Sequence, residues 1–145
     1  MSPKIIVFSK NETLETEQKA SEGLKLCQKV LNTSNPICPA LLDKAFLKIC
    51  EHRGKISESN DELAESLGGY FGRLLKNEFN MSWHYIDDEY GREKALIDEK
   101  SGSVIFPVNS VLKRLEGEGS QEPFFEMMFE AVKKHLNFLD EGVDN

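Results

Sequence analysis

An acidic run, Asp87-Asp88-Glu89, separates two segments of alternating hydrophobicity, with His84 and Glu93 close by in sequence. Paired carboxylates can perform acid–base chemistry, but only where their surroundings separate their pKa values. A turn beside water rarely offers such surroundings, and we expect His84 to be a solvated strand residue. Two interpretations remain, a plain hairpin loop and an acidic docking surface. For a docking surface, we expect a partner to contact Asp87, Asp88, Glu89, Tyr90, Glu93 and His84.

The other reactive side chains are scattered along the chain. An odd count of three cysteines without a C-x-x-C pair fits neither a disulfide framework nor a zinc site. We expect Cys27 and Cys50 to be core residues, whereas the place of Cys38 is left open. The three histidines form no H-x-x-x-H pair, and no G-x-S-x-G motif occurs. The sequence therefore predicts no catalytic residue, no cofactor and no metal, and it favours a protein that is not an enzyme.

Three glycines interrupt an otherwise strong amphipathic helix in the stretch Leu67-Gly68-Gly69-Tyr70-Phe71-Gly72. Each interior glycine costs a helix about 1 kcal/mol relative to alanine, so a close approach by another element is the physical reason to expect. A phosphate-binding loop is disfavoured because no Gly-Lys-Ser/Thr follows. We expect Gly68 and Gly72 to let this helix lie tight against a small sheet, with Trp83 filling the adjacent space as a core anchor.

The length, composition and charge of the chain limit the class of protein and the partners to expect. The chain has 145 residues, 39% of them hydrophobic and 30% charged, as is typical of a single globular domain. Its formal net charge of −7 disfavours broad nucleic-acid binding and would attract a basic protein partner. No apolar run is long enough to span a bilayer, and no signal peptide is evident, so we expect a cytoplasmic location without membrane contact.

Local signals place the elements of the N-terminal half. The segment Ile5-Ile6-Val7-Phe8 suits either a short strand or an apolar anchor. Asn11 or Thr13 offers an N-cap for the first helix, and Pro39 suits the first turn of the second. The Ser59-x-x-Glu62 spacing is that of a capping box, and it predicts a third helix that ends near Phe79.

The second half changes period. Alternation over 81–86 predicts a strand, 94–98 reads as a second, and Val104-Ile105-Phe106 as a third, in an antiparallel meander. Asn109 or Ser110 can cap a short helix, and a long amphipathic helix follows. We therefore predict an α+β fold in one domain over 1–145. It has a mainly helical part at 11–79, a small three-stranded antiparallel meander at 81–107, and C-terminal helices at 109–139 packed on one face.

Several motifs in this order carry a family resemblance: Leu67-Gly68-Gly69-Tyr70-Phe71-Gly72, Trp83, Asp88 with Gly91, Val104-Ile105-Phe106-Pro107 and Val111-Leu112-Lys113-Arg114-Leu115. The segment from Leu63 to Glu118 resembles a family of small bacterial proteins known only as a domain of unknown function. Members of that family look similar in carrying, in this order, an L-G-x-Y-x-G motif, a tryptophan on a strand, an F-P pair and a V-x-K-R helix. The resemblance implies no reaction. Small acidic α+β proteins of this kind are also similar to the immunity partners of bacterial toxins.

Three hypotheses about function follow. The first is a binding protein, most sharply an immunity protein that neutralises a cognate, basic toxin by binding it. The second is an enzyme or small-ligand module with a pocket near the glycine helix and the sheet, lined by Trp83, Tyr70 or His84. The third is a structural homo-oligomer, in which an aromatic and methionine cluster forms a homodimer seam. That cluster comprises Phe124, Phe125, Met127, Met128 and Phe129.

Overall fold

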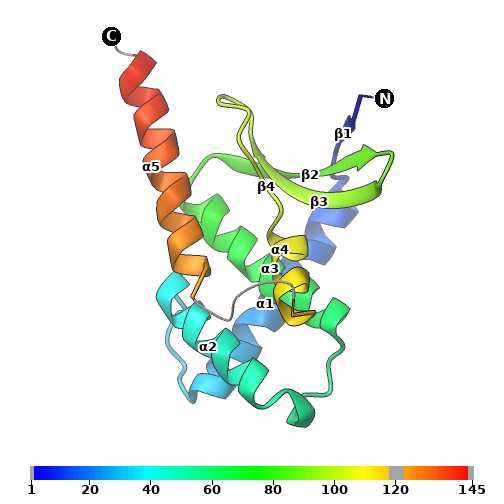
Figure 1. Ribbon diagram of the computed structural model, residues 1–145, viewed down its shortest axis with the longest axis vertical. Coiled ribbons are helices and arrows are strands. Elements are labelled where there is room, and N and C mark those ends of the chain that lie inside the picture. The colour runs from blue at the N-terminus through cyan, green and yellow to red at the C-terminus, as the bar shows by residue number, and fades with distance from the viewer. Residues whose placement is uncertain (1, 118–122, 144–145) are drawn as a thin grey trace.

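The computed structural model describes residues 2–117 and 123–143 of the chain (Figure 1). The helices are α1 (Lys10–Leu31), α2 (Pro39–Glu51), the short 3₁₀ helix η1 (Arg53–Lys55), α3 (Asn60–Glu78), α4 (Pro107–Leu115) and α5 (Phe125–Val143). The strands are β1 (Lys4–Val7), β2 (Met81–Asp88), β3 (Gly91–Asp98) and β4 (Val104–Ile105). This arrangement confirms the α+β class. Within the described ranges, no helix combines the length and the hydropathy that crossing a membrane requires.

The sheet is antiparallel throughout, in the order β1-β2-β3-β4. Strands β2, β3 and β4 form the predicted meander. The segment from Ile5 to Val7, left open between strand and anchor, lies in a fourth strand that pairs along β2, from Lys4 opposite Asp87 to Val7 opposite His84. Figure 1 shows the sheet at one end of the molecule, next to α3 and α4, while α5 runs along the side.

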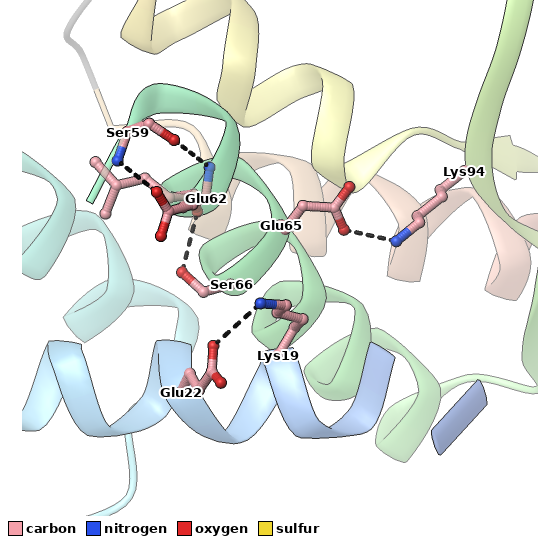
Figure 2. Close-up of polar contacts among 8 residues, drawn as sticks. Lys19, Glu22, Ser59, Glu62, Glu65, Ser66 and Lys94 are labelled. Carbon is pink, nitrogen blue, oxygen red and sulfur yellow. Dashed lines mark hydrogen bonds and ion pairs between the residues drawn. The ribbon is translucent and has the colours of Figure 1, made fainter. Parts of the chain in front are cut away.

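Helix starts follow local hydrogen bonding. The Ser59–Glu62 capping box is present at α3, as predicted, and Figure 2 shows both of its hydrogen bonds. At α1 the cap is Ser9, in a capping box with Glu12, rather than Asn11 or Thr13, because Ser9 has the same three-residue spacing to a glutamate. At α4 the expected cap at Asn109 or Ser110 is wrong, because Pro107 already occupies the first turn.

The glycines of α3 admit three different neighbours. A Cβ atom added at Gly72 would lie 2.2 Å from Cζ2 of Trp83, so the indole packs directly on the bare helix, as predicted. A Cβ atom at Gly68 would lie 2.6 Å from the Cα of Val108, so this glycine faces α4 and not the sheet. Gly69 faces α1. Three elements therefore approach α3 closely, where the sequence predicted one.

The inner face of the sheet packs on these helices. Trp83 is 3% exposed and serves as a core anchor, although its buried indole N–H has no hydrogen-bond partner within the described part of the chain. An ion pair of 2.6 Å between Lys94 Nζ and Glu65 Oε2 joins β3 to α3 (Figure 2). The face of the sheet that carries Trp83 and Lys94 is therefore turned toward α3.

The aromatic cluster near α5 belongs mostly to the core of its own chain. Phe125 packs edge-on against Phe71 and Phe46, and Phe124 is also buried. Met128 and Phe129 are half-buried against the same core, which leaves Met127 as the exposed member at 64%. Intrachain packing thus uses four of the five side chains that a dimer seam would need.

Candidate functional site

The turn between β2 and β3 carries the acidic residues singled out in the sequence. Asp88 pairs opposite Gly91, and Asp88 Oδ1 accepts a hydrogen bond of 2.9 Å from the backbone N–H of Tyr90. Gly91 has a φ of +125°, a value that favours glycine. Asp88 and Gly91 therefore form the turn, and the turn projects Tyr90, which is 90% exposed.

The negative charges of this hairpin are not equivalent. Asp87 lies opposite Arg92, and their side chains form an ion pair of 3.3 Å. The Arg92 guanidinium also lies 5.2 Å from the centre of the Tyr85 ring, which fits a cation–π contact. Glu89 and Glu93 are exposed, and neither takes part in an ion pair or hydrogen bond within the described residues. Asp88, Glu89 and Glu93 thus carry charge that no cation among the described residues neutralises, and Asp88 is also engaged in the turn.

His84 forms no ion pair or hydrogen bond with these carboxylates within the described residues. It is 4% exposed, and its neighbours across the sheet are Val7 on β1 and Ala95 on β3. Its ring Nδ1 lies 3.0 Å from the backbone oxygen of Ser82. The expectation of a solvated histidine is therefore wrong, because β1 adds a neighbour that sequence reasoning did not place beside β2.

Opposite the inner face, the sheet presents a second face, which we call the outer face. The strand register places Ile5 beside Ile86 and Glu93, and Val7 beside His84 and Ala95, with Ile97 and Val104 further along. Ile5 is 63% exposed and Val7 66% exposed. The buried hydrophobic residues of this face, Ala95 and Ile97, lie outside the main hydrophobic core. Sequence reasoning missed this face. The available signal was that Ile5-Ile6-Val7 is apolar on both sides of a strand.

The side chains proposed for a ligand pocket serve the core instead. Trp83 lies against Gly72, and the Tyr70 hydroxyl donates a hydrogen bond to the backbone oxygen of Ile37. Burial raises the pKa of Tyr70 above its ordinary value, so the phenol stays protonated. The pocket hypothesis would need these two side chains at the surface of a cavity.

Cys27 is buried in the core as predicted, whereas Cys50 is half-buried against it. Burial raises the pKa of Cys27 to about 12, and burial also raises the pKa of Cys50, so both are held as thiols near neutral pH. Cys38, left open above, is exposed. Among the described residues, no group of three or more His, Cys, Asp or Glu side chains is arranged to hold a metal ion.

A groove of about 310 Å³ runs between α1 and the start of α3. Its polar side chains largely bond to one another or to their own helix. Lys19 pairs with Glu22 at 3.6 Å, Glu62 belongs to the capping box, and Ser66 Oγ donates to the backbone oxygen of Leu63 (Figure 2). This groove therefore offers few free polar groups to a ligand.

Comparison with known proteins places this arrangement in a family. Residues 43–125, more than half of the chain, match the family described as Domain of unknown function (DUF3806). The chain belongs to the DUF3806 family. The match contains the whole of the resembling segment from Leu63 to Glu118 and extends it on both sides. Its first and last residues are themselves joined, because Asp43 accepts a hydrogen bond of 2.9 Å from the backbone N–H of Phe125.

The fold of this DUF3806 member recurs in a crystal structure from Bacteroides thetaiotaomicron VPI-5482, with a TM-score of 0.66. The two chains are 14% identical, so the likeness concerns the fold alone. The alignment covers 93% of this chain and 48% of the Bacteroides chain, so this chain spans about half the length of that protein. No curated protein matches the sequence.

Proposed function

We propose that this DUF3806 protein is a binding protein that recognises another protein through the tip of the β2–β3 hairpin and the adjoining outer face of the sheet. The observation that carries the proposal is the gathering of exposed apolar side chains beside free carboxylates at one end of the sheet. Tyr90, Ile5 and Val7 are 90%, 63% and 66% exposed. Register brings Ile5 into the same row as Glu93.

This combination suits a protein partner with a basic rim. Tyrosine is enriched among the residues that dominate binding energy at interfaces, since it brings a large apolar area and a polar tip. Glu89 and Glu93 would speed encounter with a cationic surface, and the net charge of −7 adds to that attraction. Because β1 ends the sheet order, its outer edge is also placed to accept a strand from a partner.

The sharpest version of this proposal is toxin neutralisation. An immunity protein acts by covering the active site of a toxin, and a protruding aromatic residue with acidic neighbours suits a basic active-site cleft. The test is to express the protein with the product of each neighbouring gene and to look for a stable complex and for protection of the cells. If no neighbour binds and no toxicity is relieved, the toxin version fails.

The contact surface is tested separately once a complex is in hand. Tyr90→Ala should weaken binding by about thirtyfold, corresponding to roughly 2 kcal/mol for an interface hot spot. Glu93→Lys should slow association and reduce its salt dependence. Glu51→Lys makes the same charge change at an exposed position on α2 and serves as the control. If the hairpin variants bind as tightly as the control, the hairpin is not the contact surface.

A further inference from the structure

A second groove, of about 330 Å³, is bounded by the C-terminal turns of α1 and α2 and by η1 with the loop after it. Three lysines line it, Lys29 from α1, Lys48 from α2 and Lys55 from η1, together with His52. Glu58 is its acidic lining residue. The local charge is therefore opposite in sign to that of the protein, which carries −7 overall. We call this the basic groove.

The lysines of the basic groove are not used by the fold. Within the described part of the chain, none of their side chains takes part in an ion pair or hydrogen bond. Lys29 and Lys48 lie in the last turns of their helices, where the helix dipole favours a cation. That effect accounts for a lysine at each helix end. It does not account for the convergence of both, and of Lys55, on one groove.

The wall of the basic groove is held in place by Arg53. Its guanidinium donates hydrogen bonds to the backbone oxygens of Ile56, at 3.2 Å, and Glu58, at 2.8 Å. It also donates to Asn60 Oδ1 at 2.9 Å. These bonds fix the loop that follows η1, so the groove is formed before a ligand arrives, which lowers the entropy cost of binding.

The lining is also partly apolar. Val30 and Ile56 are half-buried in the groove, next to the lysine side chains. An inorganic ion would contact the ammonium groups and leave this apolar surface wet. A ligand that has both an anionic group and an apolar portion would use both parts of the lining.

We propose that the basic groove binds a small organic anion, with a phosphate or carboxylate headgroup carried on an apolar body. The lysines hold the headgroup as point charges, and Val30 with Ile56 receives the body. This site lies on the helices, away from the β2–β3 hairpin, so the proposal stands independently of the protein-binding function.

The test uses n-hexyl phosphate, n-hexanoate, n-hexanol and inorganic phosphate as probes, followed through backbone amide resonances of the full chain. We expect n-hexyl phosphate to shift the amides of Val30, Ile56 and Ser57 saturably. Inorganic phosphate and n-hexanol should each bind at least tenfold more weakly. The ratio between n-hexyl phosphate and n-hexanoate identifies the preferred headgroup, and failure of both to bind overturns the proposal.

A pair of matched variants tests the lysines. Lys48→Gln with Lys55→Gln should weaken binding of n-hexyl phosphate by about tenfold, on the basis of two exposed ion pairs. Lys113→Gln with Lys133→Gln removes the same charge from exposed positions on α4 and α5 and should leave binding unchanged. All four lysines are exposed, so circular dichroism should show native folding in both variants. Equal affinity of the two variants, or equal binding of n-hexanol and n-hexyl phosphate, would overturn the proposal.

Discussion

Asp43 on α2 caps a helix that begins more than eighty residues later. Its Oδ1 accepts hydrogen bonds of 2.9 Å from the backbone N–H groups of Phe124 and Phe125, and its Oδ2 accepts one of 3.0 Å from Glu126. The carboxylate thus satisfies N–H groups at the start of α5 that have no partner within that helix. We predict that Asp43→Ala loosens α5 and destabilises the whole fold.

The size of the effect can be built from its parts. Loss of an N-cap costs about 1 kcal/mol, and a carboxylate at the positive end of a partly buried helix adds up to about 2 kcal/mol. Burial lowers the pKa of Arg114, and the charge of Asp43 opposes that effect, so removing Asp43 also leaves this guanidinium less well compensated. The first two contributions sum to about 1–3 kcal/mol. At about 3 °C per kcal/mol for a chain of this length, the melting temperature should fall by about 3–9 °C.

Urea denaturation at neutral pH, followed by circular dichroism, measures this change. Asp43→Asn keeps an acceptor oxygen but loses the charge, so it should fall between the wild type and Asp43→Ala. Asp61→Ala is the control, because Asp61 is an exposed carboxylate in the first turn of α3 that makes no hydrogen bond in the described structure. If Asp43→Ala costs no more than Asp61→Ala, the capping argument is wrong. In that case, the backbone amides of α5 should exchange hydrogen at the same rate in Asp43→Ala as in the wild type.

Two further predictions concern packing and reactivity. Gly72→Ala should destabilise the protein by about 1–3 kcal/mol and alter Trp83 fluorescence, because the new Cβ atom would lie 2.2 Å from the indole. Gly54 has open space around it, so Gly54→Ala should change neither the stability nor the fluorescence. Equal stability of the two glycine variants in urea would contradict the close packing on α3. Iodoacetamide at neutral pH should label Cys38 in the native protein and leave Cys27 unlabelled until the protein unfolds. The reason is that Cys38 is exposed, whereas burial raises the pKa of Cys27 to about 12. Mass spectrometry of the labelled protein measures this difference. Rapid native labelling of Cys27 would refute its placement in the core.

Local signals predicted the elements well. The Ser59–Glu62 spacing located the start of α3, and Phe79 marks its end as expected. Alternation around Trp83 predicted strand β2, and the short connections between the strands predicted the meander, although residues of both faces are buried. The start of α1 differs from the prediction, although Ser9 and Glu12 have the same capping-box spacing as Ser59 and Glu62. The sequence therefore contained the signal that locates this helix start.

What the sequence could not supply is the pairing of distant segments. The burial of His84 depends on Val7, which lies in a strand far from it in sequence. The reach of Asp43 to the start of α5 crosses the sheet and three helices in chain order. The lysines of the basic groove lie on three separate elements, so no spacing motif could have gathered them. Local patterns fix elements, whereas sites arise from contacts that have no local signature.

The three glycines of α3 also restrict how the chain can vary in length. Gly68, Gly69 and Gly72 point toward α4, α1 and Trp83 respectively, so α3 meets its neighbours through bare backbone in three directions. One residue inserted ahead of Leu67 would rotate the rest of the helix by about 100° about its axis. Large side chains such as Leu67 and Phe71 would then turn into spaces that admit no Cβ atom. The helix thus has a single permitted rotational setting, and insertions are tolerable in the loops on either side of α3 but not within it.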